Sequence, residues 1–136
     1  MADARGVTRE LERLMERTVR RLTLRIYQAV TIANPVDTGF SRGSWRVTNS
    51  PPDLEGIKRP VVREIAESQG ATLFSQHNQA AQALAGGYKL RQGQVFIWNP
   101  VFYVVFLNQG SSAQAPKRFI DRAIAKAVRA TQAEVR

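Results

Sequence analysis

The first third of the chain carries a helical repeat of apolar positions. From about Thr8 to Ala33, apolar or small side chains recur every three or four residues, so they share one face of a helix. The face consists of Leu11, Leu14, Met15, Thr18, Leu22, Ile26, Ala29 and Ala33. We therefore predict one long amphipathic helix. It should end at Asn34-Pro35, because the residue before a proline disfavours the helical conformation.

Two apolar residues, Leu24 and Tyr27, fall on the polar side of this predicted helix. Single exposed apolar side chains are common on protein surfaces and need no special explanation. A patch of two such residues is also the size of a small contact between copies of a chain. The pattern leaves both interpretations open.

The next segment predicts a turn followed by a strand. Val36–Gly39 holds the Asp, Thr and Gly residues that favour tight turns. Phe40–Asn49 then alternates in part, with Trp45 and Val47 on one side and polar residues on the other. Period-two alternation is typical of a half-buried strand, so we predict one over this range.

The middle of the chain predicts a second helix and a hairpin. Val61–Ala85 keeps a rough helical spacing, which Gly70 interrupts and Gly86-Gly87 ends. Tyr88–Asn99 then has the pattern of a β-hairpin that turns at Gln92-Gly93.

The last quarter of the chain predicts a helix after an ambiguous apolar run. Pro100–Gly110 fits a short helix and a buried strand equally well, and Gly110–Pro116 has the composition of a loop. Lys117–Val135 predicts the final helix. Its apolar face comprises Phe119, Ile120, Ala123, Ile124, Ala127 and Val128. The element order predicts an α+β fold: a long N-terminal helix, a small antiparallel sheet with helices packed on it, and a C-terminal helix.

Length and composition narrow the classes of protein that fit this pattern. A chain of 136 residues suits a single domain, 1–136. It has no cysteine, which excludes disulfides, thiolate metal sites and a thiol nucleophile, and its one histidine, His77, disfavours a multi-histidine metal centre. The longest apolar run, Val101–Leu107, is far shorter than the ~20 residues that span a membrane.

We find no pattern of residues that predicts an enzyme. His77 has no second ligand at helical spacing and is expected to be solvated or interfacial. Glu64 and Glu67 stand beside Arg63 and are expected to be surface charges. Asp37 is explained by its turn, and no Gly-Lys-Ser/Thr follows any glycine pair. We predict no catalytic, metal-binding or cofactor-binding residue, and no cofactor.

The charge balance points to anionic partners. Twenty Lys and Arg against eleven Asp and Glu give +9, with an isoelectric point near 11.0. Two helix faces carry candidate contact residues: Arg9, Arg13, Arg17 and Arg20 on the first helix, and Arg118, Arg122, Lys126 and Arg129 on the last. Glutamates interleave with the first row and leave the second less neutralised. No base-reading motif accompanies either row, so any nucleic-acid contact would be to phosphates.

Two groups of residues resemble a known family. The first is a turn and strand made of Pro35, Val36, Asp37, Thr38 and Gly39, followed by Arg42, Ser44 and Trp45. The second comprises Asn99, Tyr103, Leu107, Gly110, Ser111, Ala115 and Pro116. Both, in this order, resemble the neck and tail-completion proteins of long-tailed bacteriophages, which include head–tail joining proteins of the minor tail protein Z type. Val104 and Asn108 stand where that family usually has alanine and glutamate.

This resemblance implies a structural virion protein at the head–tail junction. Such a protein assembles as a ring, expected to be six-fold, and contacts neighbouring neck proteins: a connector or adaptor, a tail terminator or the tail tube. Viral DNA passes through the ring and could be touched non-specifically. The implied location is the virion, with assembly in the host cytoplasm and no membrane contact. The alternative is a small basic protein that binds nucleic acid without sequence preference. A small hydrolase ranks last, because no acid, base or nucleophile supports it.

Overall fold

The computed structural model describes residues 4–35, 40–52, 63–101, 104, 107–111 and 118–135. The fold is α+β, with a long first helix, a small antiparallel sheet and a C-terminal helix, as predicted. Its elements are α1 (Ala4–Ala33), α2 (Phe40–Gly43), β1 (Arg46–Thr48), α3 (Arg63–Gly86), the short helix η1 (Leu90–Gln92), β2 (Phe96–Trp98), the helical turn η2 (Leu107–Ser111) and α5 (Phe119–Val135).

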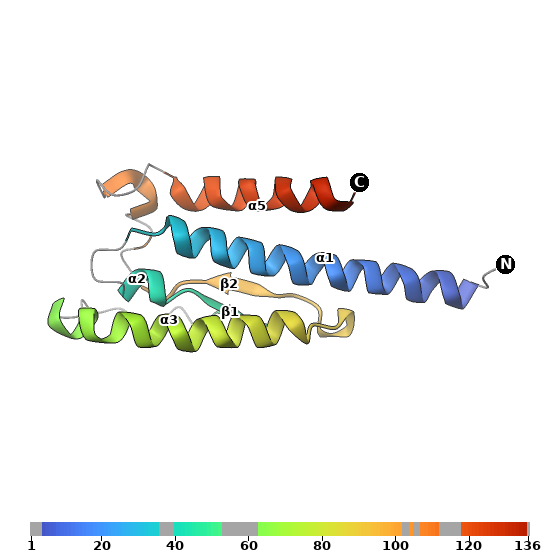
Figure 1. Ribbon diagram of the computed structural model, residues 1–136, viewed down its shortest axis with the longest axis horizontal. Helices are drawn as coiled ribbons and strands as arrows, with labels where there is room; N and C mark the ends of the chain where they lie inside the picture. The colour runs from blue at the N-terminus through green and yellow to red at the C-terminus, as the bar shows by residue number, and fades with distance from the viewer. Residues whose placement is uncertain are drawn as a thin grey trace.

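Helix α1 forms the middle layer of the molecule. In Figure 1, α5 runs antiparallel along one side of α1, and α3 lies on the other side with the two strands. The N-terminal end of α1 extends beyond the end of α5 and beyond the rest of the body (Figure 1). The C-terminal half of α1 is therefore covered from two directions, and its N-terminal half is not.

This arrangement corrects the predicted packing of the first helix. The predicted apolar face is half-buried from Leu22 onward, but Leu11, Leu14 and Met15 are 54%, 45% and 51% exposed. A second face, which the sequence pattern missed, holds Thr23, Tyr27, Val30 and Thr31 against the core. Tyr27 is only 2% exposed, so both interpretations of this residue, as an exposed side chain and as a contact between copies, are wrong.

The sheet is smaller than predicted and pairs differently. β1 and β2 are antiparallel, in a register that sets Val47 opposite Ile97. Of the predicted strand Phe40–Asn49, only Arg46–Thr48 is a strand, because Phe40–Gly43 forms α2. The predicted hairpin is also wrong.

The segment that was expected to pair with β2 is bound to α1 instead. The Tyr88 carbonyl accepts two hydrogen bonds from the Arg20 guanidinium, of 3.1 and 2.7 Å, and the Leu90 amide donates to the Glu16 carboxylate at 3.1 Å. With these backbone groups used, Leu90–Gln92 forms η1, and β2 pairs with β1.

The other predicted elements are confirmed where the structure describes them. α3 and α5 match the second and last predicted helices to within two residues at each end. Phe119, Ala123 and Ala127 are buried as expected. The predicted turn at 36–39, the second helix's first residues 61–62 and the loop at 112–116 lie outside the described residues.

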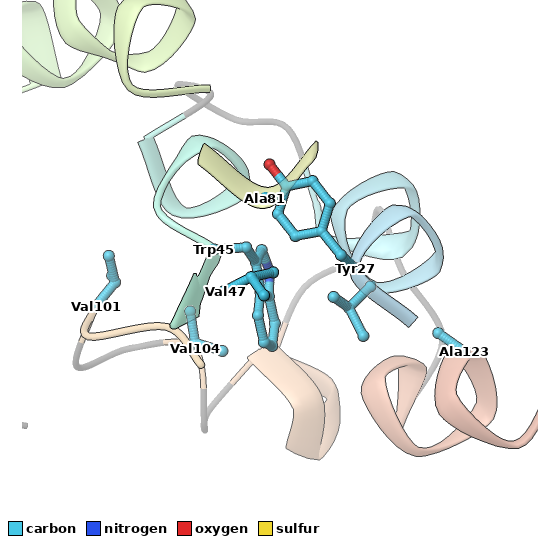
Figure 2. Packing of buried hydrophobic residues seen from close by; sticks show 8 residues of the cluster. Tyr27, Trp45, Val47, Ala81, Val101, Val104 and Ala123 are labelled. Carbon is cyan, nitrogen blue, oxygen red and sulfur yellow. The ribbon is translucent and has the colours of Figure 1, made fainter. Parts of the chain in front are cut away.

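The core gathers residues from most of these elements. Figure 2 shows Tyr27 of α1, Trp45 and Val47 at β1, Ala81 of α3 and Ala123 of α5 around one centre, with Val101 and Val104 closing one side. These side chains come from segments far apart in the sequence. Their burial fixes α1 relative to both the sheet and α5.

Candidate functional site

Most described residues of the family resemblance lie where α1 ends and β1 begins. Asn34, which is 1% exposed, is the centre of this region. Its Nδ2 donates to the Ser41 hydroxyl at 2.7 Å and to the Pro35 carbonyl at 3.0 Å, and its Oδ1 accepts from Trp45 Nε1 at 3.0 Å. A buried amide with its donors and acceptor used is stable only in this geometry.

One residue of the second group, Asn99, bonds Ser41, which lies within the segment of the first group but is not one of its family-like residues. Asn99 Nδ2 donates to the Ser41 carbonyl at 2.7 Å, and Asn99 Oδ1 accepts from the Val101 amide at 3.0 Å. We call the connected set Asn34, Ser41, Trp45 and Asn99 the polar joint. It brings residues 58 positions apart in the chain into direct contact. Ser44, beside Trp45, is fully buried.

Arg42 completes the end of α1. Its Nε donates to the Thr31 carbonyl at 2.7 Å, and its Nη2 donates to the carbonyl of Ile32. The last carbonyls of a helix have no partner within the helix, and a cation there also interacts favourably with the helix dipole. Arg42 therefore holds α2 against the C-terminal turn of α1 and is not a free surface charge.

Asn108 performs a similar task at the start of α5. Its Oδ1 accepts from the Ile120 amide at 2.9 Å, and its carbonyl accepts from the Arg118 amide. An asparagine oxygen that bonds a first-turn amide caps the helix, although here the residue comes from η2, 12 positions earlier in the chain. Asn108, which stands where the family that the chain resembles usually has glutamate, thus accepts hydrogen bonds from backbone amides at the start of α5.

The remaining family-like positions are partly described. Pro35 is buried, and Gly110 has φ of +101°, a conformation that side-chain-bearing residues rarely adopt. Leu107 and Ser111 belong to η2. The others lie outside the described residues: Val36, Asp37, Thr38, Gly39, Tyr103, Ala115 and Pro116.

A glycine contact near the joint was not predicted. A Cβ on Gly43 of α2 would lie 2.5 Å from the Gly70 carbonyl and 2.9 Å from the Phe74 amide, both in α3. Gly70 was interpreted only as an interruption of the second helix. The pairing of Gly43 with Gly70 across two helices has no signal in local spacing.

His77 supports the same crossing. Its Nδ1 lies 2.8 Å from the Gly43 carbonyl, so the side chain is half-buried within the fold and is not simply solvated. The side chains of Glu64 and Glu67 are not among those that the structure describes, and Asp37 lies outside the described residues. Across the described ranges, no group of three or more His, Asp or Glu residues is placed to hold a metal ion. No helix among these residues has the length and apolar character to cross a bilayer.

The two basic rows differ in what they contact. Arg20 of the α1 row is bound to Tyr88 and pairs with Glu16, while Arg9, Arg13 and Arg17 are exposed. Every member of the α5 row is exposed. That row consists of Arg118, Arg122, Lys126 and Arg129. In the part of the chain that the structure describes, none of its side chains forms an ion pair.

The α5 row borders a groove between α1 and α5. The groove has a volume of about 690 Å³ and combines an apolar floor with cations at its rim. Its floor contains Ala29, Ile32, Ala33, Phe119, Ala123, Ala127 and Ala130, and its polar lining consists of Gln28, Arg25, Arg122 and Lys126.

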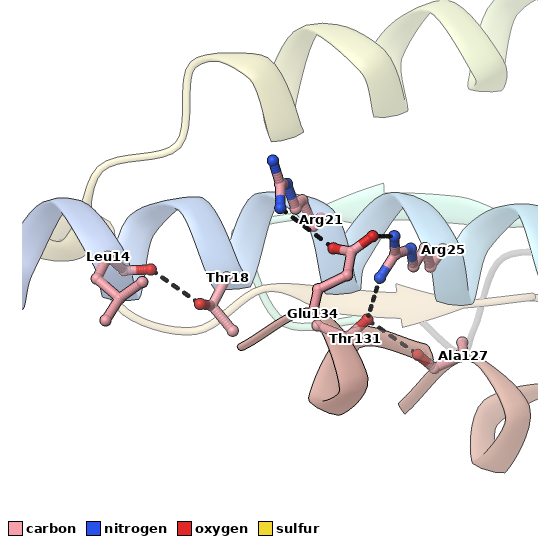
Figure 3. A network of polar contacts seen from close by, with 7 residues as sticks. All are labelled: Leu14, Thr18, Arg21, Arg25, Ala127, Thr131 and Glu134. Atoms are coloured by element: carbon pink, nitrogen blue, oxygen red, sulfur yellow. Dashed lines mark hydrogen bonds and ion pairs between the residues drawn. The ribbon is translucent and has the colours of Figure 1, made fainter. Parts of the chain in front are cut away.

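An ion-pair cluster joins the C-terminal end of α5 to the middle of α1 (Figure 3). The Glu134 carboxylate pairs with Arg25 and, at 3.2 Å, with Arg21, and Arg25 also donates to the Thr131 hydroxyl at 3.2 Å. The hydrogen bond from Arg25 holds the pKa of Glu134 below its ordinary value, and the positive charges of Arg25 and Arg21 act in the same direction.

Comparison with models of protein families, with curated proteins and with solved structures finds no match to this chain.

Proposed function

We propose that this chain is a structural virion protein of the head–tail junction in a long-tailed bacteriophage. It would join the tail to the head connector and surround the DNA path. The observation that supports this best is the bond from Asn99 to Ser41, because it unites the two separate segments that carry the family resemblance.

The chemistry of the joint suits an adaptor. Its side chains bond one another, and Arg42 beside them bonds the C-terminal carbonyls of α1, so together they hold the angle between the long helix and the sheet. A subunit of a symmetric assembly must present the same surfaces in every copy, and buried polar networks favour one geometry over its alternatives. A rigid body with its polar residues used internally is what such a task requires.

The exposed surfaces indicate the partners. The α5 row offers cations to acidic neighbours, where complementary charge sets the register of a contact. We propose copies of the chain itself in a six-fold ring, a connector or adaptor, and a tail terminator or tail-tube protein as neighbours. Passing DNA would meet such a row through its phosphates alone.

Removing the gene from the phage that encodes this chain tests the proposal. We expect DNA-filled heads and separate tails by electron microscopy, with joining restored by the protein supplied in trans. A tagged copy should appear at the neck in joined particles. Normal particles that lack the chain would overturn the proposal.

The α5 row also supports a second candidate, a non-sequence-specific nucleic-acid-binding protein. Four phosphate contacts would make the logarithm of DNA affinity fall with a slope of about −3.6 against the logarithm of salt concentration. Submicromolar affinity with such a slope, reduced in Arg122→Gln/Lys126→Gln, would favour this candidate if the gene proved dispensable for joining. An Arg9→Gln/Arg13→Gln variant is the control, since it removes the same charge from α1.

A further inference from the structure

The N-terminal half of α1 exposes an apolar surface of its own. Val7, Leu11, Leu14 and Met15 are 49%, 54%, 45% and 51% exposed and recur at helical spacing on one face. We call these four residues the N-terminal stripe. Single exposed apolar residues need no explanation, but four on one face of a helix form a contiguous patch of the kind that marks an interaction site.

The stripe continues a face that is partly covered by α5 elsewhere in the same helix. At ~100° per residue, Leu11 and Met15 align with Ala29 and Ala33, which lie against α5. The cover ends where Glu134, near the end of α5, meets Arg21 and Arg25 (Figure 3). From Ala4 to about Thr18 the same face has no neighbour among the described residues.

The rest of this segment is fixed to the body. Glu16 accepts from the Leu90 amide, and Arg20 donates to the Tyr88 carbonyl, both on the side of α1 away from the stripe. The Thr18 hydroxyl bonds the Leu14 carbonyl within the helix. The stripe is therefore held rigidly and points outward, and its ordering costs nothing further when a partner binds.

We propose that the stripe is the contact of a two-fold dimer, in which the N-terminal halves of α1 from two copies pack antiparallel. The uncovered segment is 15 residues, or ~22 Å, long, and the second copy offers a segment of equal length. With the two-fold axis level with residue 13 or so, each uncovered segment fills the space between the ends of the two α5 helices. The partner's helix then continues the line of α5.

Charge supports this pairing and sets its register. Glu10 and Arg17 are exposed and lie on the same side of the stripe, and neither forms an ion pair in the described part of the chain. In an antiparallel pair with that axis, Glu10 stands within one residue's rise of Arg17 of the partner subunit. Two identical Glu–Arg pairs result, one on each side of the axis, as an isologous contact requires.

The dimer does not depend on the proposed neck function. A ring in which all subunits point the same way along its axis contains no two-fold axis of this kind. The dimer would therefore be the state of free subunits, and it would separate when the subunits assemble into the ring. An overlap of this length also buries less surface than the ~800 Å² per partner that stable complexes bury. We therefore expect a dimer that dissociates on dilution.

Sedimentation of the full chain over a range of concentrations tests the contact. We expect a monomer–dimer equilibrium, which Leu14→Asp weakens by about tenfold or more because it buries a charge without a partner. Ile32→Asp is the matched control, since Ile32 is 72% exposed on the same helix but lies in the α1–α5 groove. Circular dichroism should show both variants folded. A wild-type chain that stays monomeric, or an Ile32→Asp variant equal to Leu14→Asp, would overturn the proposal.

A charge exchange tests the register. Glu10→Arg and Arg17→Glu should each weaken dimerisation, and the double variant should restore it. If the double variant is as weak as the sum of the single changes, the antiparallel register is wrong.

A cysteine at the stripe gives an independent test, because the chain has none of its own. Leu14→Cys should form a covalent dimer under mild oxidation, since the two copies of position 14 lie near the axis. Arg9→Cys, on the opposite face of α1, should not. Open-ended polymers without a Leu14→Cys crosslink would show a head-to-tail contact with the groove instead. None of these results bears on whether the chain is present in joined particles, so the dimer and the neck function can fail separately.

Discussion

The polar joint and the α1–α5 contact hold the same helix by different means. At the joint, Asn34 and Trp45 are 1% and 5% exposed and meet through uncharged hydrogen bonds of 2.7–3.0 Å. Along α5, small side chains such as Ala29 and Ala123 line an open groove, and the end is clasped by the exposed carboxylate of Glu134.

This difference suggests that one contact sets the shape of the molecule and the other only attaches α5 to it. A buried network loses several bonds when one member is removed, because each abandoned group keeps its desolvation cost. An exposed ion pair is screened by water and salt and contributes little. We therefore expect the joint to determine the shape of the molecule and the α1–α5 contact to tolerate change.

The largest loss should follow removal of the indole at the joint. Trp45→Ala deletes a buried ring and leaves the Asn34 oxygen without its donor, so unfolding free energy should fall by ~3–5 kcal/mol in urea denaturation. Trp98→Ala is the control, because that ring is half-buried and lies outside the joint, where it donates to the Thr48 hydroxyl and stacks with the Arg46 guanidinium. Equal losses of unfolding free energy in the two variants would mean that the joint stabilises the fold no more than an ordinary partly buried ring does.

The next largest effect should come from the helix crossing beside the joint. Gly43→Ala would force a methyl group against two backbone atoms of α3, which cannot rotate away, and should cost about 1–3 kcal/mol. Gly86→Ala, with no atom within 4 Å of its new Cβ, should be neutral or slightly stabilising. Thermal denaturation of the two variants measures the difference. A Gly43→Ala protein as stable as Gly86→Ala would contradict the close approach.

A smaller effect is expected from the arginine that ends α1. Arg42→Met keeps the aliphatic stem but removes the donors to the Thr31 and Ile32 carbonyls, and we expect a loss of about 1–2 kcal/mol. Hydrogen exchange should show the last turn of α1 opening more often while the α5 amides are unchanged. If exchange rises equally in both helices, Arg42 acts on the whole fold and not on the helix end.

The smallest effect should come from the clasp, and it should depend on pH. The folded state lowers the pKa of Glu134, so its contribution is present above the ordinary value of 4.5 and is lost as pH falls through the lowered pKa. Glu134→Gln should therefore melt below the wild type at neutral pH, and the difference should shrink as the pH falls below 4.5. Glu12→Gln, a carboxylate without an ion pair in the described residues, is the control. A difference that persists in acid would show that charge is not the cause.

The elements were largely predictable because their periodicity is local. The predicted apolar faces of α1 and α5 follow from spacing alone, and both helices are confirmed. The second buried face of α1 was missed because a single amphipathic stripe implies one covered side, whereas Tyr27 and Val30 are covered by a different layer. Phe40–Gly43 was assigned to a strand because four residues are too few to separate two periodicities.

The candidate site was predictable only as a set of positions. The resemblance named Arg42, Trp45 and Asn99, but no spacing rule links Asn99 to Ser41 or Gly43 to Gly70. Asn34, the centre of the joint, was interpreted only as the residue before a proline. These contacts depend on how the chain folds back, which a single sequence does not encode in any local pattern.

The unbroken length of α1 makes it a lever with its pivot at the joint. A helix of 30 residues is ~45 Å long, so a rotation of about 5° at the pivot would move the far tip by about 4 Å. Adjustments that the buried side chains could absorb at one end would be magnified at the other, where a neighbouring molecule would feel them as a change of position.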